Sequence, residues 1–256
     1  MDTLSSKKHN IREEVSPEEW KLRLELAAAY RVAADYGWDD MLITHFSARV
    51  PGADGHFLLN PFGLLFEEIT ASNLVKVDQD GNAVMPTEYA INPAGFVIHG
   101  AIHGARDDAH VILHTHTVEG MAVAAQEDGL LPLTQTALTV YSDLAYHDFE
   151  GIVLDADERE RLLPAIGDKN NVILRNHGLM TLGGTVGEAF FRMHTLQRAC
   201  EAQVMAQAGG KKLILLSPEV QDRVDAQSRV AGAPLGYFTG EALLRKAARL
   251  DPGFSD

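Results

Sequence analysis

Two histidines lie one residue apart at the end of a short apolar segment, in the sequence Val111-Ile-Leu-His-Thr-His-Thr117. Side chains alternate between the two faces of a β-strand, so the imidazoles of His114 and His116 point to the same side. His177 also follows an apolar segment, and the glycine after it permits a sharp turn. Three convergent imidazoles with an open coordination position are typical of a catalytic metal site. The spacing therefore predicts a metal centre at these residues, with ordinary core or surface histidines as the alternative.

The chain has 11 histidines, and the remaining ones differ in what their positions predict. His99 and His103 are spaced i, i+4 on a predicted helix and share one of its faces. We expect one of them to face the site, as a substrate contact or as a group that orients a ligand. His147, between a tyrosine and an aspartate, is a candidate acid or base. Spacing alone gives ordinary structural or surface roles to four others, His45, His56, His110 and His194.

Composition excludes several classes of protein. The chain has 256 residues and a formal charge of −14, with 22 basic residues and no basic cluster, which argues against nucleic-acid or anionic-membrane binding. Its single cysteine, Cys200, excludes an internal disulfide and a cysteine-rich zinc module. That cysteine lies in an apolar helical pattern and is expected to be buried. The N-terminus lacks the apolar stretch of a secretion signal, so the expected compartment is the cytoplasm.

The pattern along the chain predicts one α/β domain over residues 16–210, between a flexible segment at 1–15 and a helical tail at 211–256. Helices are expected at 16–36, 92–103, 120–126 and from 185 past 202, the first opened by a capping box between Ser16 and Glu19. Strands are expected at 43–50, 57–60, 73–78, 82–85, 111–117 and 171–178. Antiparallel-looking strands with interspersed helices predict a three-layer α/β/α domain around a mixed, largely antiparallel sheet.

Several motifs over residues 18–207 together resemble the class II aldolase/adducin family. They are Asn60-Pro-Phe-Gly63, the segment 71–81, Ala105-Arg-Asp-Asp-Ala109, His114-Thr-His-Thr117 and Asn176-His-Gly178. The resemblance implies an α/β/α domain, bound Zn²⁺ (with Fe²⁺ or Mn²⁺ as alternatives) and a small-molecule substrate. It also implies a homotetramer with active sites between subunits. Matched motif to motif, the metal ligands are again His114, His116 and His177.

The chain departs from the aldolases of this family where they hold substrate. Those aldolases carry a Ser-Ser-Glu segment whose carboxylate is the catalytic acid or base, and here the matching residues are Pro93-Ala-Gly95. Two phosphate-binding segments have become Thr44-His45-Phe46-Ser47 and Asn60-Pro-Phe-Gly63. Because phosphate is bound by dense hydrogen-bond donation, these changes predict a substrate without phosphate. The same match places His45, Asn60 and Gly63, together with His99, at the substrate.

Three hypotheses follow. The first is a metal-dependent lyase, in which the metal polarises a carbonyl and a side chain moves a proton. The candidates for that proton transfer are Tyr141, His147, Glu88 and Glu119. The second is a non-haem iron oxygenase that uses the same three histidines, with an aromatic pocket for its substrate. The third is an adducin-like binding or scaffold protein, which the loss of the glutamate favours and the intact histidine triad opposes.

Overall fold

The structure, a computed structural model, describes residues 11–53, 55–151 and 158–256. The strands are β1 (His45–Arg49), β2 (Phe57–Leu59), β3 (Val75–Val77), β4 (Val111–Thr115), β5 (Leu144–His147), β6 (Asn171–Leu174) and β7 (Gly178–Gly183). They form one sheet in the order β3-β2-β1-β4-β7-β6-β5, in which only β5 and β6 pair in parallel among the described residues. The predicted mixed, largely antiparallel sheet is therefore confirmed.

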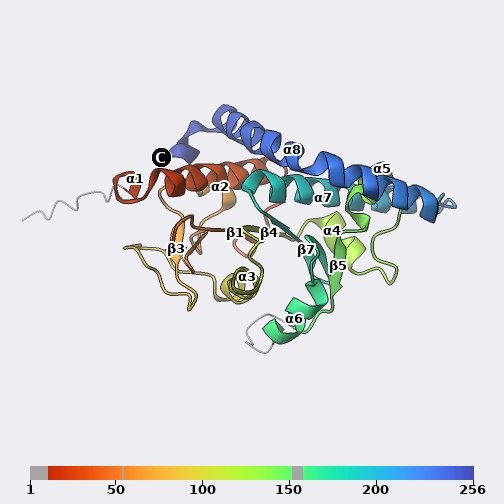
Figure 1. Ribbon diagram of the computed structural model, residues 1–256, viewed down its shortest axis with the longest axis horizontal. Coiled ribbons are helices and arrows are strands. Elements are labelled where there is room, and N and C mark those ends of the chain that lie inside the picture. The colour runs from red at the N-terminus through yellow and green to blue at the C-terminus, as the bar shows by residue number, and fades with distance from the viewer. Residues whose placement is uncertain (1–10, 54, 152–157) are drawn as a thin grey trace, which may run out of the picture.

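Helices cover both faces of this sheet (Figure 1). They are α1 (Ile11–Glu14), α2 (Pro17–Asp35), α3 (Pro93–Ala105), α4 (Val118–Ala124), α5 (Gln135–Tyr141), α6 (Glu158–Ile166), α7 (Val186–Ala208) and α8 (Pro218–Leu250), with 3₁₀ turns at Phe66–Glu68 and Pro252–Ser255. On one face α2 and α7 pack on the strands, with α4, α5 and α8 against α7. On the other face α3 and α6 enclose a second core with apolar strand residues. The three layers are those that the sequence predicted.

The start of α2 shows how the sequence forms its elements. Ser16 caps the helix, because its hydroxyl oxygen accepts a hydrogen bond of 3.1 Å from the backbone N–H of Glu19, and Pro17 takes the first helical position. The Glu19 carboxylate does not complete the predicted capping box. It is buried and instead accepts hydrogen bonds from Arg23 at 3.0 Å and Lys76 at 2.7 Å. These two cations satisfy the carboxylate better than a single backbone N–H would.

Some other predictions differ from the structure, and some of its elements were not predicted. The segment 82–85 is not a strand; it turns back on β3 through an isolated bridge between Val77 and Ala83, and the Asp78 side chain accepts the backbone N–H of Asn82 in this turn. Strands β5 and β7 and helix α6 were not predicted. Residues 1–10 of the predicted flexible segment lie outside the described residues, and residues 11–14 form α1.

Helix α8 runs along the outside of α7 and α2 (Figure 1). Its residues Leu243 and Ala247 are buried in the main core. It crosses α7 where Gly187 faces Gly236 and Gly240, so closely that a Cβ atom on Gly187 would lie within 3.0 Å of backbone atoms of both. Small residues thus let the two backbones approach. Among the described residues, no helix combines the length and the apolar character needed to cross a bilayer.

Candidate metal centre

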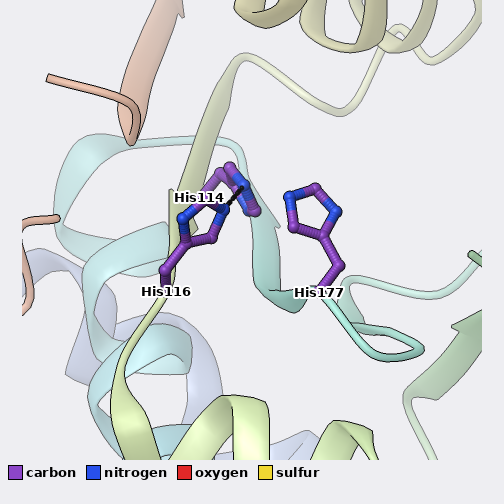
Figure 2. Close-up of side chains that lie close together, drawn as sticks. All are labelled: His114, His116 and His177. Atoms are coloured by element: carbon purple, nitrogen blue, oxygen red, sulfur yellow. Dashed lines mark hydrogen bonds between the residues drawn. The ribbon is translucent and has the colours of Figure 1, made fainter. Parts of the chain in front are cut away.

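The structure brings His114, His116 and His177 together (Figure 2). Their candidate ligand nitrogens all lie within 4.8 Å of one another. His114 is on β4, His116 follows the end of that strand, and His177 lies in the turn between β6 and β7. Because β7 pairs antiparallel with both β4 and β6, the sheet itself carries this turn to the end of β4.

The hydrogen bonds of two of these rings leave a lone pair on each inner nitrogen. His114 Nδ1 lies 3.0 Å from the Leu179 carbonyl oxygen, and His116 Nδ1 lies 3.1 Å from a carboxylate oxygen of Asp40. Both oxygens only accept, so both Nδ1 atoms carry the hydrogen and both Nε2 atoms are bare in the neutral rings. The two Nε2 atoms are only 2.9 Å apart (Figure 2). Facing lone pairs at this distance repel unless a proton or a cation lies between them.

Burial disfavours a positive charge on the rings of His114 and His177 themselves. It lowers the pKa of His114 well below its usual value and the pKa of His177 to about 4, and the neighbouring imidazoles lower both further. Neutral imidazole is the form that binds metal. The donor set, the tautomers and the low basicity therefore all fit a divalent cation.

Two residues beside this centre adopt left-handed backbone conformations, which residues other than glycine rarely take. Met41 has φ of 49° and follows Asp40, the partner of His116. Asn176 has φ of 56° and precedes His177. Such conformations concentrate at functional sites, where the surrounding structure maintains them. Here they set the direction of one ligand and of one ligand's hydrogen-bond partner.

His45 is placed next to the triad by strand register. It pairs directly with His114 across β1 and β4, and the two ring centroids are 5.2 Å apart. Its ring lies against Gly95 in the first turn of α3, where a Cβ atom would come within 2.8 Å of His45 Cδ2. The position that matches the family glutamate is therefore free of a side chain, and the His45 ring occupies the adjoining space.

This contact predicts that positions 45 and 95 are energetically coupled. Gly95→Ala is expected to destabilise the protein by about 1–3 kcal/mol, because the His45 ring is confined by His99 and His114 and cannot move aside. In a His45→Ala background the same change is expected to be neutral within ~0.5 kcal/mol. Urea unfolding of the four proteins in this double-mutant cycle measures the coupling. Additive free energies would show that the two positions do not interact.

His99 and His103 have different surroundings, although both are buried. The His99 ring centroid is 4.4 Å from that of His45, so His99 packs against His45, which in turn lies beside His114 of the triad. His103 instead contacts Phe57 and a hydrogen bond joins its Nδ1 to the Ala109 carbonyl at 2.9 Å. Ser47 lies between the two histidines, with its hydroxyl 2.7 Å from each.

These buried histidines predict loss of stability in acid. Burial lowers the pKa of His45 to about 4 and that of His103 to about 3, whereas an unfolded histidine titrates near 6.5. The unfolded chain therefore takes up protons first as the pH falls below about 6.5, and the stability that is complete above this pH is lost progressively toward pH 4 and 3. The slope is about 1.4 kcal/mol per pH unit for each histidine. Urea unfolding at pH 7.5, 6 and 5 measures it, and a constant free energy would contradict the prediction.

Asn60 and Gly63 lie in the loop after β2. Asn60 is buried, and its Oδ1 is 2.9 Å from the Tyr30 hydroxyl, so this side chain anchors the loop to α2. Gly63 is exposed and has φ of 103°, a conformation that favours glycine. In the described part of the chain, neither residue forms a hydrogen bond with the triad.

The four predicted acid–base residues have separate locations. His147 is buried at the end of β5, close enough to His177 to lower the pKa of that histidine. Tyr141 ends α5 and packs on the main core. Glu119 accepts a hydrogen bond of 3.2 Å from Gln197 of α7. Glu88 is exposed and lines a separate hollow of about 800 Å³ near Arg23. Among the described residues of one chain, His147 is the one of these four that interacts electrostatically with a triad histidine.

Two residues of this region, Asp40 and Ser47, were not among the sequence predictions. Asp40 lies 76 positions before its partner His116, and no spacing rule links residues so far apart. Ser47 was noted only as part of a segment that lost its phosphate-binding character. Its position two residues after His45 on a strand does place both side chains on one face, which is the only signal the sequence offers.

Comparison with known proteins identifies the family. Residues 24–204 match the Class II Aldolase and Adducin N-terminal domain, so the chain belongs to this family, as its motifs predicted. It resembles an aldolase II superfamily protein from Pseudomonas syringae, with 51% identity and a TM-score of 0.93 over 96% of this chain and 99% of that one. An L-fuculose 1-phosphate aldolase from Glaciozyma antarctica is 28% identical, with a TM-score of 0.81 over 100% of this chain and 97% of that one. Mouse (Mus musculus) alpha-adducin is 45% identical over 225 residues, which are 86% of this chain and 30% of the adducin.

Proposed function

We propose that the protein is a divalent-metal-dependent lyase of the aldolase type, which cleaves or decarboxylates a small carbonyl compound without a phosphate group. The observation that carries this proposal is the pair of bare, inward-facing Nε2 atoms of His114 and His116, 2.9 Å apart beside His177. We propose Zn²⁺ as the cation, with Fe²⁺ and Mn²⁺ as alternatives. When bound, the cation supplies Lewis acidity toward a substrate carbonyl.

The chain's own groups orient and enclose this centre. The Leu179 carbonyl holds the His114 ring through its Nδ1–H, and the Asp40 carboxylate holds His116 in the same way. Such partners fix the tautomer and the direction of a ligand ring. His45 and His99 close the side of the centre toward α3. The proposed substrate contacts of Asn60 and Gly63 would come from the loop after β2.

A proton must also be moved, and Gly95 offers no carboxylate for this purpose. His147 is the best supported of the candidates, because it is buried and its electrostatic interaction lowers the pKa of His177. Tyr141 packs on the main core and Glu88 lines a separate hollow, so we propose that either would serve only if a second subunit brought it to the site. This agrees with the proposed homotetramer with sites between subunits. Light scattering is expected to show a species of four times the 27.9 kDa chain mass, and a monomer alone would refute the tetramer.

Metal analysis of protein purified without added metal tests the proposed function. About one zinc per chain, together with exchange of the α-protons of dihydroxyacetone in D₂O by NMR, would support the lyase. Stoichiometric iron with oxygen consumption would replace it with the oxygenase. Absence of metal, with a thermal stability that a chelator does not change, would refute both.

An adducin-like binding protein is the second candidate. The 45% identity to mouse alpha-adducin and the glycine at position 95 favour it. This candidate, in which the metal site is vestigial, predicts a protein that does not exchange the dihydroxyacetone protons with or without added zinc. The lyase predicts exchange that is lost on chelation and restored by zinc.

Asp40→Asn is expected to weaken zinc binding by about 10–100-fold, the usual cost of removing a carboxylate that supports a ligand histidine. The amide has a similar shape but no charge, so the fold should be unchanged. Competition with a chromophoric chelator measures the affinity. Asp39→Asn is the matched control, because Asp39 forms no hydrogen bond or ion pair with the triad within the described residues. Equal affinities for the wild type and Asp40→Asn would show that this carboxylate does not support the site.

A further inference from the structure

A chain of buried hydrogen bonds runs from the far end of α3 to the wall of the metal centre. Its members are Ala109, His103, Ser47 and His99, and the three links between them are 2.9, 2.7 and 2.7 Å. All the side chains in it are buried. Short, buried links of this kind have definite donors and acceptors, so the direction of each bond can be worked out.

The direction follows from the Ala109 carbonyl, which can only accept. His103 Nδ1 therefore carries a hydrogen, and the other nitrogen of this neutral ring is a lone pair. That lone pair accepts the single hydroxyl hydrogen of Ser47, so the Ser47 oxygen must accept in turn from His99 Nδ1. Burial lowers the pKa of both histidines, which keeps them neutral. His99 Nε2 is consequently a bare lone pair.

The series of hydrogen bonds ends at His99, whose other nitrogen has no hydrogen-bond partner among the described residues. His99 Nε2 is buried and unpartnered, and so is Nε2 of His45, whose ring lies beside it. The nearest acceptor to His45 Nδ1 is the Ile43 carbonyl at 3.4 Å, which places the hydrogen of that ring on Nδ1 as well. Buried nitrogens without a partner are uncommon in native proteins and call for an explanation. Two of them side by side, next to a metal triad, indicate a missing ligand group.

We propose that His45 and His99 form an acceptor-only wall of the metal centre, which selects a substrate that carries a hydroxyl group beside its carbonyl and rejects a phosphate group in place of that hydroxyl. A hydroxyl donates a hydrogen to such a lone pair. The oxygens of a phosphate dianion can only accept, so they meet the lone pairs with repulsion. The inference rests on the proposed function for the location of the carbonyl, but the direction of the hydrogen-bond chain is independent of it.

The first test reads the tautomers directly. Imidazole ¹⁵N NMR of the metal-free protein is expected to show His99 and His103 with hydrogen on Nδ1 only. In Ser47→Ala, His99 loses the acceptor for that hydrogen, and its Nε2–H form is expected to become populated. Thr181→Ala is the matched control. It removes a buried hydroxyl of the same sheet, which donates to the Ala189 carbonyl and takes no part in the series of hydrogen bonds from Ala109 to His99. A wild-type His99 with hydrogen on Nε2 would overturn the proposal.

The second test measures selectivity in the zinc-loaded protein. Hydroxyacetone is expected to bind at least about tenfold more tightly than methoxyacetone, which lacks the donor, and at least about tenfold more tightly than hydroxyacetone phosphate, in which a phosphate ester replaces the hydroxyl. Ser47→Ala should reduce both ratios severalfold, and Thr181→Ala should retain them. Equal binding within either pair, or no binding of the hydroxy ketones, would overturn the proposal. Failure to bind zinc would instead refute the proposed function and leave the tautomer result to stand alone.

Discussion

Replacing His114 and His116 together with alanine is expected to abolish metal binding while the fold is retained. The two substitutions remove both bare Nε2 atoms, and His177 alone cannot hold a divalent cation at micromolar concentration. Metal analysis and calorimetric titration with zinc measure the loss. In the presence of zinc at about 1,000 times the dissociation constant, the wild type should also be more stable than the variant by about 4 kcal/mol.

The controls for this double variant separate binding from folding. With a chelator present, circular dichroism should show the same secondary structure in both proteins. His110→Ala provides a matched loss of an imidazole, because His110 is exposed just before β4, and it should bind zinc like the wild type. Retention of stoichiometric zinc in the double variant would show that the ligands have been assigned wrongly.

Gly187→Ala is expected to destabilise the protein by about 3 kcal/mol or more. The added methyl group would meet the backbone of Gly236 and Gly240 at the crossing of α7 and α8. Backbone atoms cannot rotate away as a flexible side chain can, so the two helices must separate. Because α8 places Leu243 and Ala247 in the main core, this separation also exposes apolar surface. Urea unfolding measures the change.

Gly104→Ala is the matched control for this prediction. Gly104 also lies in a helix, but a Cβ atom there would have no neighbour within 4 Å. Alanine has the higher helix propensity, so this variant is expected to gain about 0.5–1 kcal/mol. Opposite signs for the two substitutions would establish that the crossing requires glycine. A loss below ~1 kcal/mol for Gly187→Ala would indicate that the helices are free to adjust.

The sequence predicted those features that depend on local periodicity. The triad could be found because strand alternation places His114 and His116 on one face, and because His177 follows an apolar run. Strand β5 (Leu144–His147) contains no β-branched residue and only one tyrosine, so its strand propensity is low. Helix α8 was predicted only as partly helical, because its glycines lower local helix propensity. Packing on α7 and α2 outweighs that propensity.

Features that depend on long-range packing could not be predicted. The contact of Asp40 with His116 requires the turn after α2 to lie over the end of β4. The contact of His45 with Gly95 requires α3 to lie against β1. The sequence showed that position 95 lacks a carboxylate, but it gave no indication of what occupies the space instead. That information comes from the register of β1 on β4.

The close approach of His45 to Gly95 also constrains the order in which these two positions can change during evolution. While His45 is present, any side chain at position 95 meets its ring, so a carboxylate cannot be gained there in a single tolerated step. Once residue 45 is smaller, position 95 becomes free to vary. Descendants of this chain would therefore have to lose the histidine before they could acquire a glutamate. Sequences with a bulky residue at 45 and a side chain at 95 should be rare among proteins with this register.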